Sequence, residues 1–280
     1  MIRKPILILT VLILAGTVAA WHGPGHVALT RSAVEALPES MPAFFRQGGG
    51  AISHVSVDPD LFRLKENPQL RDEEVPDHFF DLELLGDAKL PPTRYEFIRL
   101  CAGKSLDPAK VGMLPYAITE WTGRLTVAFA EYRRWPDDPA IQCKCMVYAG
   151  LLAHYAQDLE NPLHTTVDYD GRGPAQAGKG IHSRVDGAIQ SISSSPAEPR
   201  RLEKVLPAVW EELLASHKLV DRVYELDKEI PAEGQPLPEQ GPASEFFRER
   251  YRSAASFTAS LYWTAWCDSE KFPLPEWHKR

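Results

Sequence analysis

The chain has 280 residues, a formal net charge of −7 and a hydrophobic content of 44%. It is long enough to bury the core of one large domain. Its excess of acidic residues argues against a broad basic groove for duplex nucleic acid.

The first 20 residues have the pattern of a secretory signal. Arg3 and Lys4 form a charged start, and the apolar run over residues 6–14 is too short to span a bilayer. Small residues lead to an acceptable cleavage site after Ala20. An uncleaved membrane anchor is the alternative. We therefore expect a secreted or periplasmic protein whose mature chain begins at Trp21.

A mature N-terminus at Trp21 would offer metal ligands of its own, because its free α-amino group and its carbonyl can chelate an ion in a five-membered ring. His26 follows near the start of an expected helix over residues 27–37. The Gly-Pro-Gly run at residues 23–25 would let the chain fold back so that Trp21 and His26 converge. An ordinary N-terminal turn with a surface histidine is the alternative.

Two short segments further along carry candidate polar side chains. Asp60 and Arg63 lie one turn apart where a loop enters a short helix, although a helix cap would also explain Asp60. His78 is flanked by Asp77 and Asp81 and followed by Phe79 and Phe80. This pattern suggests either a His–Asp pair that supports a nearby site or an aromatic recognition wall. A plain edge of the core explains the same residues.

Most of the remaining chain shows helical periodicity and no sustained β alternation. Long helices are expected over residues 114–134, 140–158, 200–226 and 243–267, of which the first and last are amphipathic. Pro207 marks an expected break near the start of the third. The predicted fold class is all-α, with a single domain over residues 21–280 around a buried polar centre.

The polar centre is marked most clearly near the end of the second long helix. His154 and Asp158 are four residues apart, so they share one helix face with Cβ atoms about 6 Å apart. Pro162 then stops the helix shortly before His164. Neutral imidazole and carboxylate groups are usual ligands of zinc. A structural His–Asp pair without metal is the alternative.

The same spacing recurs after a Gly-rich loop. His182 and Asp186 open a second apparent helix that continues through Ile192. One such pair alone would be weak evidence. Two pairs together with His164 favour a site for more than one metal ion.

Four cysteines, Cys101, Cys143, Cys145 and Cys267, allow three disulfide pairings in a secreted chain. Cys143 and Cys145 are too close in the sequence to pair comfortably with each other. A metal site of the C-x-C type is a further use for these two thiols.

The sequence resembles the trinuclear zinc phosphodiesterases in the order of its motifs. These are a Trp at the mature N-terminus, a nearby His, H-F-x-D, H-x-x-x-D-x-x-x-x-x-H and H-S-x-x-D. That superfamily joins the zinc-dependent phospholipases C with the S-one/P-one type nucleases, which prefer single strands. The resemblance runs from Trp21 to about Asp186, and the last hundred residues carry no recognised motif.

The resemblance implies ligands for three zinc ions. The first ion would be held by Asp60, His78, His154 and Asp158, the second by Trp21, His26 and Asp158, and the third by His164, His182 and Asp186. Asp158 would therefore bridge two ions. Asp58 competes with Asp60 for its role, and Arg63 at the D-x-x-R spacing of the nucleases favours Asp60.

The resemblance also implies a mechanism. Paired zinc ions about 3.5–4 Å apart would share a hydroxide that attacks phosphorus, while the third ion neutralises the leaving oxygen. Arg63 would stabilise the transition state and Asp60 would orient the hydroxide. Phe79 and Asp81 match positions that, in the nucleases, stack on a base and hydrogen-bond to its edge. The zinc charges would let an acidic chain hold a phosphate diester.

The favoured function is a secreted endonuclease acting on single-stranded DNA or RNA, with 3′-nucleotides as further substrates. The step from Trp21 to His26, the presence of Arg63, and Asp186 where phospholipases usually carry Glu favour this branch. A zinc-dependent phospholipase C acting on phospholipid head groups is the alternative. A zinc-binding protein without turnover is the third. No stable protein partner is implied, so we expect a monomer.

Overall fold

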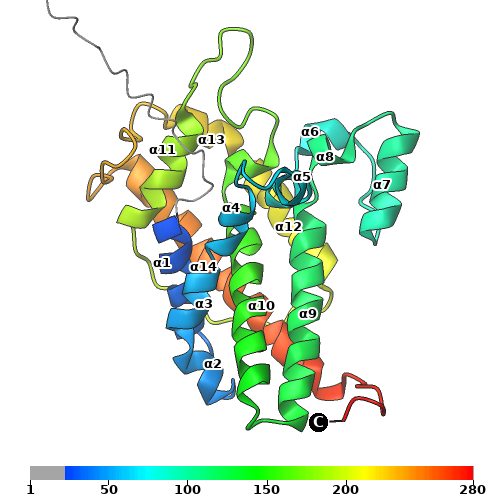
Figure 1. The fold of residues 1–280 in the computed structure, drawn as a ribbon. Helices are drawn as coiled ribbons and strands as arrows, with labels where there is room; N and C mark the ends of the chain where they lie inside the picture. The colour runs from blue at the N-terminus through cyan, green and yellow to red at the C-terminus, as the bar shows by residue number, and fades with distance from the viewer. Residues whose placement is uncertain (1–22, 280) are drawn as a thin grey trace, which may run out of the picture.

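Two long antiparallel helices, α9 (Leu114–Arg134) and α10 (Pro139–Asp158), form the axis of this computed structural model, which describes residues 23–279 (Figure 1). A short turn joins them. The start of α10 is well defined because Asp138 caps it, accepting a hydrogen bond from the backbone N–H of Ala140 at 2.9 Å. Pro139 follows in the first helical turn, where its missing N–H is not needed.

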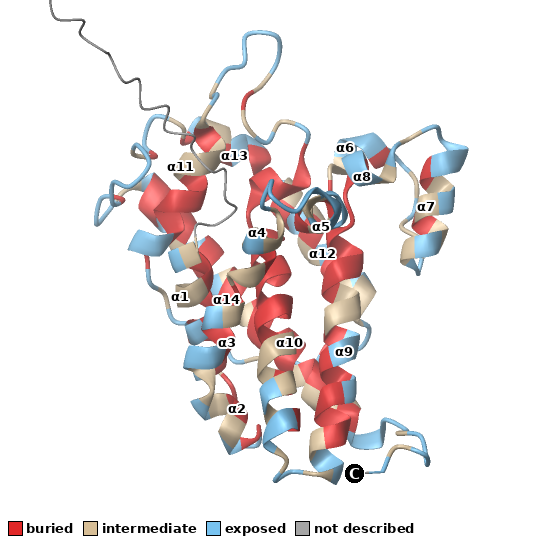
Figure 2. Cartoon of the chain, viewed as in Figure 1, coloured by how far each residue is buried: buried red, intermediate tan, exposed pale blue. Residues whose placement is uncertain are grey.

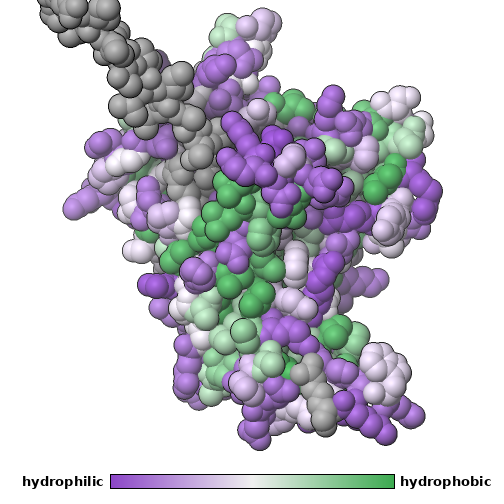
Figure 3. Space-filling model, in the orientation of Figure 1, coloured by the Kyte–Doolittle hydropathy of each residue, from purple (hydrophilic) through white to green (hydrophobic). Residues whose placement is uncertain are grey.

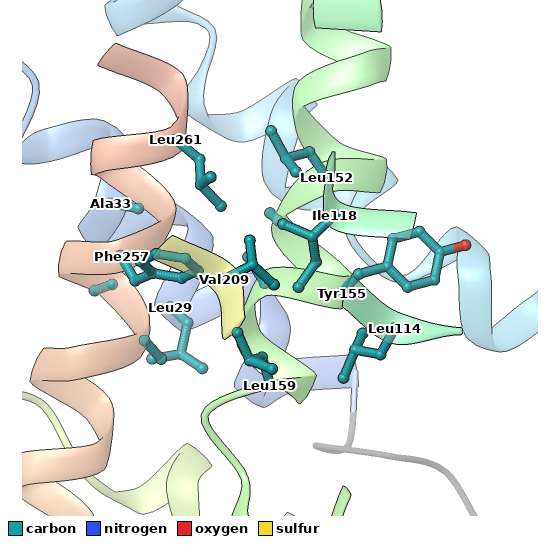
Figure 4. Packing of buried hydrophobic residues seen from close by; sticks show 14 of the residues in the cluster. Leu29, Ala33, Leu114, Ile118, Leu152, Tyr155, Leu159, Val209, Phe257 and Leu261 are labelled. Carbon is teal, nitrogen blue, oxygen red and sulfur yellow. The ribbon is translucent and has the colours of Figure 1, made fainter. Parts of the chain in front are cut away.

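Three further helices cover this pair: α1 (Gly23–Glu35), α12 (Val205–His217) and α14 (Pro242–Asp268). The helices meet through apolar side chains that recur with helical spacing, so each helix turns one face inward. Figure 4 shows Leu29 and Ala33 of α1, Leu114 and Ile118 of α9, Leu152, Tyr155 and Leu159 near the end of α10, Val209 of α12, and Phe257 and Leu261 of α14.

The shorter elements surround this bundle. The α-helices are α2 (Ala43–Gln47), α3 (Gly49–Val55), α4 (Asp58–Phe62), α5 (Pro68–Glu74), α6 (Leu82–Leu85), α7 (Arg94–Gly103), α8 (Pro108–Val111), α11 (Ile181–Ala188) and α13 (Val220–Glu225). The 3₁₀ turns are η1 (Val75–His78), η2 (Pro162–Thr165), η3 (Ile189–Ser191) and η4 (Ser269–Lys271). Over residues 23–279 extended structure is confined to two isolated bridges, so the all-α class is confirmed.

The C-terminal half of α10 is the most enclosed part of the chain. Every residue from 149 to 166 is buried (Figure 2). Gly150 allows this close packing, because a Cβ atom there would lie 2.6 Å from the Ile52 carbonyl oxygen and 2.6 Å from the Cβ of Val55. The backbones of α3 and α10 therefore approach closely one turn before the first of the predicted ligands in α10.

Two expected helices differ from those observed. α1 begins at Gly23, so the Gly-Pro-Gly run is the first turn of a helix rather than a hinge. Proline is tolerated there because first-turn N–H groups have no intrahelical partner. The segment 200–226 is split into α12 and α13, and Pro207 lies inside the first turn of α12 instead of breaking it.

All four cysteines have free thiols in this structure. Cys143 is exposed and Cys145 is buried, since neighbouring odd positions on α10 face different sides of the helix. Among residues 23–279, no helix is both long and apolar enough to cross a membrane. The expected signal segment and Trp21 lie outside the described residues.

Candidate metal centre

The described histidines and aspartates that were predicted as ligands meet at the C-terminal end of α10. They form three groups in which the ligand atoms lie within 4.8 Å of one another. The groups are His26, His154 and Asp158; Asp60, His78 and His154; and His164, His182 and Asp186. Helices α1, α4, α10 and α11 and the turns η1 and η2 all contribute, so the tertiary fold assembles the site.

The group containing His78 lies against α4. Nδ1 of His78 is 3.0 Å from Nε2 of His154 and 3.0 Å from Oδ2 of Asp158. Oδ1 of Asp60 lies 3.8 Å from Nε2 of His154. Asp60 is therefore the aspartate of α4 that joins these ligands, and Asp58 is in none of the three groups.

His26 reaches Asp158 from the other side. Its Nε2 atom is 3.5 Å from Oδ1 of Asp158, and its ring stacks on that of His154 with centroids 4.0 Å apart. The two oxygens of Asp158 thus face different imidazoles. His26 is completely buried, unlike the surface histidine of the alternative interpretation.

The third group connects η2 with α11. Nε2 of His182 lies 3.1 Å from Nε2 of His164 and 3.1 Å from Oδ2 of Asp186. Asn161 caps η2, and its amide also donates to Oδ1 of Asp186 at 2.7 Å. One side chain therefore fixes both the turn that presents His164 and the carboxylate opposite it.

Outer hydrogen bonds determine which nitrogen of each imidazole faces the centre. Nδ1 of His26 lies 2.7 Å from the Gln157 side-chain oxygen, Nδ1 of His154 lies 2.8 Å from the Ser56 carbonyl, and Nδ1 of His164 lies 2.7 Å from the His78 carbonyl. Since all three partners are acceptors, each Nδ1 carries a proton, so in the neutral imidazole Nε2 is the nitrogen whose lone pair faces the centre.

His78 has the opposite orientation, with Nδ1 toward the centre. Its Nε2 lies 3.4 Å from the Glu74 carboxylate, which also accepts a hydrogen bond from the Tyr155 hydroxyl. Burial opposes ionisation of Glu74, but the nearby His78 imidazole and the hydrogen bond from Tyr155 hold its pKa below the usual value. A charged carboxylate behind His78 is the arrangement that orients metal-binding imidazoles.

The donor set fits a divalent cation. Nε2 of His26, Oδ1 of Asp158 and Oδ2 of Asp186 are buried without any hydrogen-bond partner among the described residues. Orphaned buried atoms call for an explanation, and a bound cation would satisfy these three together. Two ligands of a tetrahedral zinc ion stand about 3.3 Å apart when each bond is about 2.0 Å long. The separations between ligand atoms given above, from 3.0 to 3.8 Å, lie close to this value.

Protonation states also suit metal binding. Burial lowers the pKa of His164 to about 4, so its imidazole is neutral at physiological pH. Burial disfavours the charge on Asp158, yet the imidazoles of His154 and His164 hold its pKa well below the usual value. Neutral imidazole and ionised carboxylate are the forms that bind metal. Burial lowers the pKa of His154, but the Asp158 carboxylate raises it above its usual value. A cation bound beside His154 would instead favour its neutral imidazole.

Arg63 lies at the margin of the centre, and Phe79 follows the predicted ligand His78 in the chain. The Arg63 guanidinium pairs with Oδ1 of Asp60 and keeps 19% of its side chain exposed. Phe79 is half-buried beside His78, whereas Phe80 is fully buried in the core. Burial, with a contribution from Glu83, raises the pKa of Asp81 to about 7.

Sequence reasoning missed the outer partners. Glu74 carried a usable signal, because it precedes His78 by four residues, the spacing already used for two His–Asp pairs. Gln157 and Asn161 carried weaker ones as polar residues within a buried apolar segment. The Ser56 carbonyl carried none, because a backbone acceptor has no sequence signature.

No protein-family model matches the chain, and no curated protein matches it significantly in sequence. The superfamily resemblance consequently rests on the motif residues and on the way the fold brings them together.

Proposed function

We propose that this protein is a zinc-dependent phosphodiester hydrolase and that its substrate is single-stranded nucleic acid. Asp158 carries the proposal: it lies between His26 on one side and His78 and His154 on the other. A carboxylate shared in this way supports two ions close enough to act on one phosphate group. The Trp21 amino group would complete the ligands on the His26 side.

Bound zinc would supply water activation near neutral pH and Lewis-acid stabilisation of phosphoryl oxygens. The residues of the chain have complementary tasks. Asp60 would orient the attacking water and accept its proton. Arg63 holds that carboxylate and, being partly exposed, can donate to an equatorial phosphoryl oxygen as negative charge develops.

The preference for nucleic acid rests on the residues next to His78. Phe79 offers an accessible apolar ring, and Asp81 offers a carboxyl group for a base edge. Stacking of a base on an aromatic side chain contributes about 1–3 kcal/mol. We further propose export by the N-terminal signal, three zinc ions per mature chain, and action as a monomer.

One turnover panel tests the proposal. Single-stranded DNA, RNA, a 3′-nucleotide, phosphatidylcholine and a chromogenic phosphodiester would each be assayed with and without chelator, alongside elemental analysis of the purified protein. We expect close to three zinc ions, chelator-sensitive turnover and a preference for the nucleic acids. Zinc near one ion per chain would remove the trinuclear interpretation, and zinc without any turnover would favour the silent binding protein.

One observation favours the phospholipase C alternative. Leu61 and Leu64 flank Arg63 and are 54% and 48% exposed. Figure 3 shows hydrophobic side chains gathered over α3 and α4 on the same face. An apolar rim beside a phosphodiester site is suited to a lipid surface. Faster turnover of phosphatidylcholine than of DNA, with loss of that turnover in Leu61→Ser, would select this alternative.

A further inference from the structure

Tyr169 is an exposed aromatic residue at the edge of the third ligand group. Tyr169 is 52% exposed, and its ring centroid lies 5.6 Å from that of His182, with the two ring planes at 76°. Among residues 23–279 the Tyr169 hydroxyl has no hydrogen-bond partner. The edge of the ligand group therefore carries an accessible ring that the fold itself does not use.

The backbone around Tyr169 is fixed on both sides. The Tyr224 hydroxyl donates to the Asp168 carbonyl and accepts from the Gly171 N–H at 2.9 Å. The Asp170 carboxylate accepts from the N–H groups of Gly180 and His182 at 2.8 and 3.2 Å. A ring held on such a backbone loses little conformational entropy on binding, which is the property of a preformed contact.

The surroundings favour a flat, uncharged ligand over an anion. Asp168 and Asp170 flank the ring in sequence. Arg172, the next cation along the chain, already lies over the Tyr224 ring at 4.1 Å and pairs with Asp221 at 2.8 Å. An additional phosphate would gain little here, whereas a nucleobase could stack on the exposed ring.

The same segment is tied to the proposed base site. The Glu83 carboxylate accepts hydrogen bonds from the Thr166 hydroxyl and, at 3.2 Å, from the Val167 N–H. Glu83 follows Asp81 by two residues. Glu83 thus links the segment that leads to Tyr169 with the segment that follows Phe79 and Asp81.

We propose that Tyr169 forms a second base-stacking subsite, which takes the base adjacent to the one bound by Phe79 and Asp81. The inference rests on the proposed nuclease function and adds a length requirement to it. A 3′-mononucleotide has only one base and would engage Phe79 alone. A strand of two or more nucleotides would engage both rings.

The test compares Tyr169→Ala with Tyr169→Phe and with Tyr95→Ala, which removes a 75% exposed tyrosine on α7. Affinity is measured by fluorescence anisotropy with a phosphorothioate oligonucleotide, and KM and kcat with single-stranded DNA and a 3′-nucleotide. Tyr169→Ala should weaken oligonucleotide binding about 5- to 150-fold, the range that base stacking supports. Tyr169→Phe and Tyr95→Ala should resemble wild type, with zinc content unchanged in all three.

Equal oligonucleotide affinity for Tyr169→Ala and Tyr95→Ala would overturn the subsite while leaving the nuclease function intact. Equal losses on the oligonucleotide and the 3′-nucleotide, accompanied by zinc loss, would also overturn it, because Tyr169 would then only support His182. A wild-type protein that neither cleaves DNA nor binds the oligonucleotide would contradict the proposed function and the subsite together.

Discussion

Nε2 of His26 lies 3.5 Å from Oδ1 of Asp158, where the first helix of the bundle meets the end of α10. Both atoms are buried and neither has a hydrogen-bond partner among the described residues. The second oxygen of Asp158 lies 3.0 Å from Nδ1 of His78. The two oxygens of Asp158 therefore face different imidazoles, as the proposed bridge between two cations requires.

Removing the charge of this bridge should cost metal affinity and not only rate. Asp158→Asn keeps the shape of the side chain but leaves two cations with less compensation. We expect zinc affinity to fall by more than the about 10- to 100-fold loss that follows removal of a residue hydrogen-bonded to a metal ligand. Zinc titration measures it, with exposed Asp87→Asn as the control. Wild-type zinc content and activity in Asp158→Asn would contradict the bridging role.

The N-terminus provides an independent prediction. A variant with one extra residue before Trp21 replaces the free amine by an amide, which cannot coordinate as an amine does. Elemental analysis should find one zinc ion fewer than in the mature wild type, and turnover should be poor. Full activity and unchanged zinc in the extended protein would show that Trp21 is not a ligand.

Glu74 should control metal binding through His78 without touching the metal. Glu74→Gln removes the charged acceptor behind Nε2 of His78 and should lower zinc affinity about 10- to 100-fold. Tyr155→Phe should have a smaller effect, because the carboxylate remains. Glu73→Gln, an exposed neighbour, is the matched control. If Glu74→Gln binds zinc like Glu73→Gln, the carboxylate does not position His78.

Phe79 separates the two enzyme functions. In a nuclease, Phe79→Ala should weaken nucleotide binding by about 1–3 kcal/mol and raise KM more than it lowers kcat. The measurement uses single-stranded DNA and short-chain phosphatidylcholine in parallel. A defect confined to the lipid would make phospholipase C the preferred function. Reduced stability with similar losses on every substrate would instead identify Phe79 as a packing residue.

A buried ion pair outside the ligand groups should give stability a pH dependence. Arg250 donates to Glu160 at 3.1 Å, but burial outweighs it and raises the Glu160 pKa from its usual value near 4.5 to about 7. The folded state then holds the proton more tightly than the unfolded state. The contribution of Glu160 to the free energy of unfolding should therefore decrease as pH rises from about 4.5 to about 7.

Urea unfolding of wild type and Glu160→Gln at several pH values isolates this contribution, since glutamine does not titrate. Exposed Glu66→Gln serves as the control. The difference in the free energy of unfolding between wild type and Glu160→Gln should change with pH in the stated direction, by more than the difference between wild type and Glu66→Gln changes. A difference that grows in favour of wild type with rising pH would mean that attraction to Arg250 exceeds the cost of burial.

Much of the fold was predictable because apolar periodicity and caps mark long helices well. The 114–134 helix was predicted with both ends correct, and the 140–158 helix within one residue at its start. Proline positions were harder to interpret. Pro24 and Pro207 were taken as signs of a turn or a break, but both lie in first turns, where a proline costs little.

The candidate ligands were easier to predict than the residues that contact and orient them. His–Asp pairs at four-residue spacing are visible in a sequence, and the fold brings the described ones together. Glu74, Gln157 and Ser56 act through atoms that converge only in three dimensions. Aromatic exposure was equally hidden, because Phe79 and Phe80 are adjacent and only the structure distinguishes the accessible ring from the buried one.

The ligand groups draw on helices from α1 to α11, so occupied metal sites would cross-link segments that are remote in the chain. Each ion that binds only the folded state adds stability that grows with free zinc concentration. If the proposed export delivers the chain without metal, its folded state would have low stability until zinc bound, and would then resist unfolding and proteolysis. Under the proposed secretion, the lifetime of the protein outside the cell would follow the zinc supply there, and a competitor that sequesters zinc would remove the protein as well as its activity.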